Sequence, residues 1–239
     1  MVKRVTSERA RTSIEVAVAY TLATGIASAL YHLQAVPFVH ANLHALVAAV
    51  FLLLPQLILR RRGDVGEYGF TTHPRALGLA IAFGAMVLIL PIFIGGFVAY
   101  GRALCAWAPR LAPSSCARIL HPHLRLPSGF AMLVAAQLIV IALPEELFFR
   151  GYLQTRLEQA WPPRWKLWGA PVGGAWIATA ALFGLGHFLV TFEPQMLSRF
   201  FPGLVFGWMY ARTRSIMAST LFHAACNVLM DVLAHSFYG

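Results

Sequence analysis

Long apolar runs separated by short polar segments make up most of the chain. A membrane-spanning helix needs about 20 predominantly apolar residues, and most of the runs reach that length. They cover residues 14–33, 38–59, 76–100, 129–159, 172–190, 196–210 and 216–234. The pattern predicts an all-α, polytopic membrane helix bundle of about seven transmembrane helices, with six to eight possible if a segment is broken or re-entrant. We interpret residues 1–239 as one transmembrane domain.

Composition supports a membrane protein and argues against a nucleic-acid-binding one. Hydrophobic residues make up 59% of the chain and charged residues only 12%, about half the charged fraction of a soluble domain. The net charge of +10 comes mainly from Lys and Arg in the loops, where these residues set membrane orientation. We therefore expect the lipid bilayer, and no nucleic acid, as a partner.

Basic residues are distributed unequally between the two sides of the predicted bundle. Alternating loops place thirteen Lys or Arg residues on the side of the N-terminus, namely Lys3, Arg4, Arg9, Arg11, Arg60, Arg61, Arg62, Arg75, Arg156, Arg164, Lys166, Arg212 and Arg214. The other side carries five, namely Arg102, Arg110, Arg118, Arg125 and Arg199. Because Lys and Arg are enriched in cytoplasmic loops, we predict an integral protein of the bacterial inner membrane, with its N-terminus in the cytoplasm and its C-terminus outside.

Ionisable residues interrupt the fourth apolar run, where Pro144 is followed by Glu145, Glu146 and Arg150. One charged residue near the bilayer centre costs about 2.5–3.5 kcal/mol on insertion scales. Glu146 and Arg150 are four positions apart, so they can pair on one helical face. Glu145 lies about 100° round the helix from Glu146 and is the carboxylate left available for chemistry. Pro144 removes a backbone donor, which should loosen the helix beside the acids.

Histidines interrupt two later runs. His187 follows Phe183 by four positions in the fifth run, and His223 precedes Asn227 by four positions in the seventh. Glu145 and His187 each lie 16 residues from the loop that joins their runs, which is about 24 Å along a helix. Antiparallel neighbouring helices would therefore bring these two residues to one depth. The estimate places His223 and Asn227 at a shallower level, and a tilted helix would close the gap.

These residue types suffice for hydrolysis of an amide bond without a covalent intermediate. A carboxylate that faces an imidazole can hold a water molecule and accept its proton, which is general-base catalysis. We expect Glu145 and His187 to do this. His223 and Asn227 would donate hydrogen bonds to the developing oxyanion.

The same residues allow other interpretations. Glu145, His187 and His223 also form a zinc-type ligand set with an open position. Asn227 favours the reaction without a cofactor, because Asn is a poor zinc ligand and a good oxyanion donor. A non-catalytic immunity or scaffold protein would keep the residues for packing alone. A transporter would use the carboxylates as a proton relay, but no polar path continues into the first three runs.

Three motifs, in this order, resemble those of the CPBP (Abi) family of intramembrane endopeptidases, which contains the CAAX-prenyl proteases and the bacteriocin-processing enzymes. They are Glu145-Glu146-x-x-x-Arg150, Phe183-x-x-x-His187 and His223-x-x-x-Asn227. The resemblance covers a motif-bearing core at about residues 130–232, and residues 1–128 carry none that we recognise.

The resemblance implies an intramembrane protease, glutamic-type rather than metallo-type in our interpretation. Glu145 and His187 would activate water, and His223 and Asn227 would bind the oxyanion. The supporting residues would be Glu146, Arg150 and Phe183. The implied partner is a peptide or protein substrate in or at the membrane, either lipid-modified or merely membrane-anchored. A site that opens outward would favour exported substrates over cytosolic prenylated ones.

A few polar positions lie outside these motifs. His40 and His44 are four apart in the second run, and we expect them to be packing residues near the outer surface. Glu15 follows the basic N-terminal tail and should pair there. Cys105 and Cys116 lie close together in the chain, where a disulfide and two free thiols are both possible.

Overall fold

The computed structural model describes residues 2–60, 68–71, 73–107, 116 and 123–237. The basic loop predicted after the second span mostly lies outside these residues. Among the described residues, six helices are long and apolar enough to cross a membrane. They are Glu8–His32, Pro37–Ile58, Arg75–Trp107, Phe130–Ala160, Gly174–Thr191 and Met217–Phe237. The prediction of an all-α, polytopic bundle is confirmed, with the number of spans at the lower end of the predicted range.

Helices account for nearly all of the described structure. They are α1 (Val2–His32), α2 (Pro37–Arg60), α3 (Arg75–Trp107), α5 (Phe130–Ala136), α6 (Leu143–Glu146), α7 (Thr155–Ala160), α8 (Gly174–Thr191), α9 (Phe200–Thr213) and α10 (Met217–Phe237). Two π-helical segments, η2 (Gln137–Ala142) and η3 (Leu147–Gln154), and one 3-10 segment, η4 (Pro194–Arg199), complete the helical elements.

The predicted sixth span at residues 196–210 is a short element that is not among the six candidate membrane spans. It consists of η4 followed by α9, whose 14 residues extend only about 21 Å, less than the hydrocarbon core of about 30 Å. The end of η4 and the start of α9 pack closely against α8. A Cβ on Gly184 would lie 2.9 Å from the Leu197 carbonyl oxygen and 3.0 Å from the Phe200 nitrogen. The absence of a side chain there lets the end of η4 approach the middle of α8.

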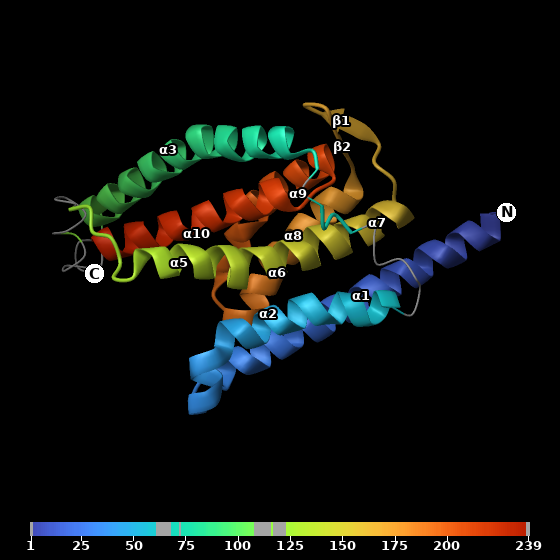
Figure 1. Cartoon of the computed structure of the whole chain (residues 1–239), viewed down its shortest axis with the longest axis horizontal. Coiled ribbons are helices and arrows are strands. Elements are labelled where there is room, and N and C mark those ends of the chain that lie inside the picture. Colours follow the sequence, from blue (N-terminus) through green and yellow to red (C-terminus); the bar gives the residue numbers. More distant parts are fainter. Residues whose placement is uncertain (1, 61–67, 72, 108–115, 117–122, 238–239) are drawn as a thin grey trace.

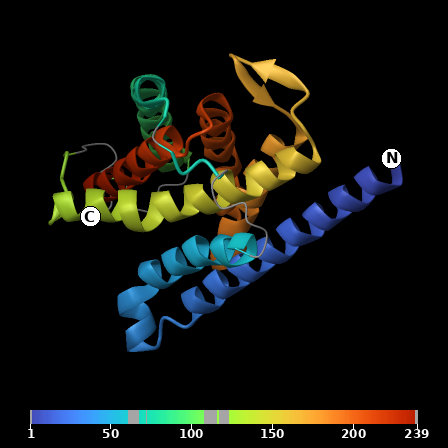
Figure 2. The same ribbon diagram turned by 45° about the vertical axis from the view of Figure 1, so that its right-hand side comes forward.

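The helices lie in groups around the long helix that runs from α5 to α7 (Figure 1). On one side α1 and α2 form an antiparallel pair, seen also in Figure 2. On the other side α10 packs against α3, α9 and η2. Helix α8 contacts α1, α9 and η3. The largest core cluster therefore joins residues from both halves of the chain, including Phe51, Phe148, Phe149, Phe183 and Phe206.

The long helix departs from α-helical geometry on both sides of its acidic residues. The four-residue segment α6 carries Pro144, Glu145 and Glu146, with η2 before it and η3 after it. Wider π-helical turns inside a helix are rare and occur often at functional sites. The loosening expected beside Pro144 takes this form, and no break interrupts the helix.

Glu15, for which we expected a partner in the basic tail, pairs with the far end of the long helix. Its carboxylate accepts hydrogen bonds from Arg156 Nε at 2.9 Å and Nη2 at 3.1 Å. Tyr152 Oη donates to the same carboxylate at 3.1 Å. A two-point contact between a carboxylate and a guanidinium is a strong, directional interaction. It fixes α1 against η3 and α7, and so against the helix that carries the acids.

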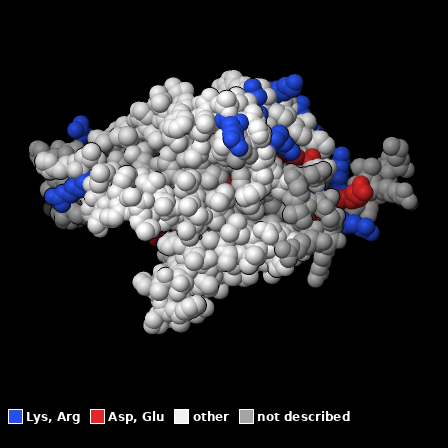
Figure 3. All heavy atoms as spheres, in the orientation of Figure 1, with Lys and Arg blue, Asp and Glu red and all other residues white. Residues whose placement is uncertain are grey.

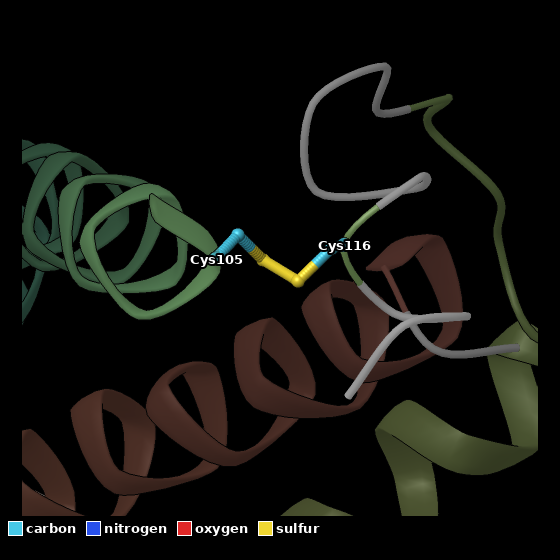
Figure 4. Close-up of a disulfide and its surroundings, with 2 residues drawn as sticks. All are labelled: Cys105 and Cys116. Atoms are coloured by element: carbon cyan, nitrogen blue, oxygen red, sulfur yellow. A yellow bond between two sulfur atoms is a disulfide. The ribbon is translucent and has the colours of Figure 1, made fainter. Parts of the chain in front are cut away.

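A disulfide joins Cys105, near the end of α3, to Cys116 (Figure 4). The sequence allowed either this bond or two free thiols. The two sulfurs pack with Leu233 and Phe237 at the end of α10. This end of the bundle is therefore held by a covalent bond as well as by apolar packing.

A small β-hairpin connects α7 to α8, where the sequence predicted only a loop and a span from residue 172. Strand β1 (Trp165–Leu167) pairs antiparallel with β2 (Ala170–Val172), and Lys166 lies opposite Pro171. Figure 2 shows the hairpin projecting from the bundle. Helix α8 consequently begins at Gly174, two residues later than predicted.

Candidate active site

Glu145 lies between two imidazoles that come from different helices. Its Oε2 is 3.8 Å from His187 Nε2 on α8 and 3.8 Å from His223 Nε2 on α10. Both separations exceed direct hydrogen-bond length. They are the kind of polar separation that a bridging water fills. Glu145 retains 15% and His187 28% of its side-chain exposure, so the group is partly accessible.

Glu146 has the opposite environment, because it is fully buried and ion-paired. Its Oε1 accepts from Arg150 Nη1 at 2.8 Å and lies 2.9 Å from His223 Nδ1. Arg150 Nη2 also donates to the Gly203 carbonyl at 3.2 Å. Both Glu146 and Arg150 side chains have 0% exposure. The pairing predicted from their spacing is thus present, and it extends to His223 on α10.

Aromatic rings surround the guanidinium and the imidazoles. The Arg150 guanidinium carbon lies 4.4 Å from the Phe183 ring centroid and 5.1 Å from that of Phe206. Phe206 stacks on the His223 ring at 4.6 Å with an interplanar angle of 17°. Phe183 packs edge-on against His187 at 4.6 Å. A cation over an aromatic face is attracted by the ring quadrupole, so Phe183 and Phe206 hold the charged group in place.

Hydrogen bonds at Nδ1 orient both imidazoles toward Glu145. His187 Nδ1 lies 2.9 Å from the Phe183 carbonyl. A carbonyl oxygen only accepts, so Nδ1 carries the proton and Nε2 of neutral His187 is an acceptor. His223 Nδ1 donates in the same way to Glu146. Each Nε2 therefore faces Glu145 Oε2, and each ring is fixed by the bond on its other nitrogen.

An apolar pocket of about 250 Å³ adjoins this group, and Glu145 and His187 form part of its wall. Half of its lining residues come from α1 and α2, including Thr24, Tyr31 and Ala48. Sequence motifs gave these two helices no role. His44, which we expected to be a packing residue, also lies on the pocket wall.

A signal for the α1 contribution does exist in the sequence. Ala19, Ala23 and Ala27 recur every four positions, and all three are buried at 2% exposure or less. A face of small residues permits close approach of membrane helices. This spacing could have indicated that α1 packs tightly against the motif-bearing core and shapes the site.

The structure brings Glu145, His187 and His223 together, as well as Glu146, Arg150 and Phe183. Asn227 lies one turn beyond His223 on α10 and is half-buried. Among the described residues, no group of three or more His, Cys, Asp or Glu side chains is arranged to hold a metal ion.

Comparison with known proteins identifies one family. Residues 127–229 match the family model described as type II CAAX prenyl endopeptidase Rce1-like. The matched segment begins near the start of α5 and ends within α10, so it contains every motif residue named above. No curated protein and no solved structure matches the chain.

Proposed function

We propose that this protein is an intramembrane endopeptidase that uses Glu145 to activate water, supported by the match of residues 127–229 to the Rce1-like model of type II CAAX prenyl endopeptidases. The observation that carries the proposal is the position of Glu145 Oε2, which is 3.8 Å from Nε2 of both His187 and His223. The substrate would be a membrane-associated or lipid-modified peptide whose apolar part enters the adjoining pocket.

The reaction would begin with a water molecule bound between Glu145 and His187. The Nε2 lone pair of His187 and a Glu145 oxygen accept hydrogen bonds from this water and fix its orientation. Glu145 takes a proton as the water oxygen attacks the carbonyl carbon of the scissile bond. The peptide carbonyl becomes a tetrahedral oxyanion. Glu145 then returns the proton to the leaving nitrogen, and the C–N bond breaks.

His223 and Asn227 would stabilise the oxyanion. The Asn227 amide can donate directly. His223 can donate from Nε2 only when both of its nitrogens carry protons, since Nδ1 already donates to Glu146. The Glu146 carboxylate balances that positive charge, and Arg150 holds Glu146 in position. Donors fixed before the reaction begins lower the barrier without reorganisation. We therefore give Glu146 and Arg150 a positioning role.

The proposal includes the orientation inferred from charge, with the disulfide end outside. Disulfides persist in oxidising compartments such as the periplasm and are rare in the cytosol. The Cys105–Cys116 bond lies at the end of the bundle where α10 finishes. The opposite end carries Arg9, Arg156 and Arg214. Two independent features thus support a cytoplasmic N-terminus.

The experiment that tests the function uses the full chain in lipid nanodiscs with membrane-anchored peptides. Products are identified by mass spectrometry. We expect cleavage at one bond by the wild type and none by His187→Asn. The control variant His235→Asn carries the same substitution at an exposed histidine and should cleave like the wild type. If no peptide is cut, or if His187→Asn cuts as fast as His235→Asn, the protease assignment fails.

A further inference from the structure

The β-hairpin between α7 and α8 is fixed to the bundle through one of its strands. Ala170 and Val172 on β2 are 0% exposed and pack with Ala211 on α9. Trp208 Nε1 donates a hydrogen bond to the Leu167 carbonyl at 2.8 Å. The hairpin therefore presents its outer strand and turn in a defined position.

Large aromatic side chains are exposed along this segment. Trp168 at the turn is 82% exposed, Trp165 on β1 is 47% exposed, and Trp161 just before the hairpin is 41% exposed. Trp168 also has a φ of 47°, a left-handed conformation that bulky residues rarely adopt. Gly169 follows with a φ of 80°, so the two residues form the left-handed two-residue turn that β-hairpins favour. Trp168 contacts the Trp208 ring edge-on, with 6.2 Å between centroids, but most of its indole surface stays exposed.

Basic side chains accompany the indoles. Arg164 and Lys166 are exposed, and the Arg212 side chain lies over Gly169, where Nε would be 3.1 Å from an added Cβ. Within the described part of the chain, none of these three forms an ion pair with an acidic side chain. Figure 3 shows Lys and Arg gathered toward the end of the molecule that carries the hairpin.

Neighbouring arginines show that ion pairing is available at this end of the molecule. Arg156 pairs with Glu15 at 2.9 Å, and Arg214 pairs with Glu158. Arg164, Lys166 and Arg212 therefore differ from these neighbours, because none of the three has an acidic partner among the described residues. That arrangement suits an anionic ligand from outside the chain.

The position of the hairpin indicates which kind of anionic ligand it would meet. It connects two candidate membrane spans, Phe130–Ala160 and Gly174–Thr191, so it lies where lipid headgroups begin. Trp is enriched at this depth, and basic residues near an anionic leaflet are attracted to its surface. We propose that Trp165 and Trp168 sit in the headgroup region and that Arg164, Lys166 and Arg212 bind the headgroups of anionic phospholipids. This inference does not depend on protease activity.

The first test measures phospholipid binding to the detergent-purified full chain by native mass spectrometry. Phosphatidylglycerol should bind the wild type more tightly than phosphatidylcholine. Arg164→Gln/Lys166→Gln should weaken phosphatidylglycerol binding by roughly thirtyfold, or about fivefold for each basic residue near an anionic surface. Arg9→Gln/Arg11→Gln removes the same charge from exposed positions on α1 and should change binding by less than about threefold. Equal losses in the two variants, or no preference for phosphatidylglycerol, would overturn the proposal.

The second test locates the indoles in nanodiscs that contain phospholipids brominated close to the headgroup. Trp168→Phe should reduce the fraction of tryptophan fluorescence that these lipids quench. Trp176→Phe, which removes a half-buried indole that donates to the Leu204 carbonyl at 2.8 Å, should not reduce that fraction. An unchanged fraction in Trp168→Phe would contradict the proposal. So would displacement of the bound lipid by millimolar inorganic phosphate, because it would identify a free-phosphate site in place of a lipid site.

Discussion

Glu146 and His223 are 77 positions apart in the chain, and their side chains meet at 2.9 Å between Oε1 and Nδ1. This contact joins the acidic segment of the long helix to α10. Because it occupies Nδ1, it directs His223 Nε2 toward the neighbouring Glu145. Two adjacent glutamates therefore have separate tasks. Glu146 holds the second imidazole, and Glu145 faces both imidazoles with an Oε2 that has no hydrogen-bond partner among the described residues.

Loss of the buried guanidinium should destabilise the protein. Arg150→Met leaves Glu146 buried without its main counter-charge, a change that costs about 3–5 kcal/mol. Arg9→Met changes an exposed side chain on α1, and surface substitutions usually change stability by no more than about 0.5 kcal/mol. Unfolding by SDS titration in mixed micelles compares the two variants. Similar losses of unfolding free energy would contradict the account of Arg150.

Filling the pocket should impair substrate binding more than chemistry. Ala48 is 8% exposed and lines the pocket beside Glu145, so Ala48→Phe should raise KM by roughly tenfold or more for substrates with a bulky apolar group, as expected from lost apolar contact. The value of kcat should change much less. Ala45→Phe on the exposed face of α2 is the matched control. The pocket has no part in binding if both variants have wild-type KM.

Membrane orientation can be read from cysteine accessibility. In intact cells with Cys226→Ser, a membrane-impermeant maleimide added outside should label Cys105 and Cys116 only after treatment with a reductant. Labelling of these cysteines only after the cells are opened would place the disulfide end in the cytoplasm and reverse the proposed topology.

The hydrolysis should need no bound metal. Purified, active protein should contain far less than one zinc per chain by elemental analysis, and prolonged dialysis against a chelator should leave kcat/KM within about twofold. Activity that disappears on dialysis and returns with zinc would assign Glu145, His187 and His223 to the alternative metal-ligand role. Residual metal that has no effect on the rate would not assign these residues to a metal-ligand role.

The sequence predicted the helical elements and the grouping of motif residues because both follow from helix periodicity. Spacing of four predicted the Glu146–Arg150 pair, and equal distance from a common loop predicted that Glu145 and His187 share a depth. The depth estimate for His223 was less accurate, because it assumed parallel helix axes. Its Nε2 is as close to Glu145 as that of His187.

Features that depend on tertiary packing could not be predicted in the same way. Hydropathy predicted one span at residues 196–210, and it could not predict the 3-10 segment η4 before the 14-residue helix α9 or their close contact with Gly184. Local charge could not indicate that Glu15 also pairs with Arg156, which is 141 positions away. The pocket walls on α1 and α2 carry small and apolar residues, which have no motif to identify them.

The central claim is that Glu145 is the base that activates water, and its most direct test is the single-turnover cleavage rate of Glu145→Gln with saturating enzyme. The amide keeps the size of the side chain but cannot accept the proton, so we predict a rate reduced by about 10²–10⁴-fold, the usual contribution of a general base. Glu193→Gln, an exposed change beside η4, should retain the wild-type rate. A Glu145→Gln rate within about threefold of this control would contradict the account.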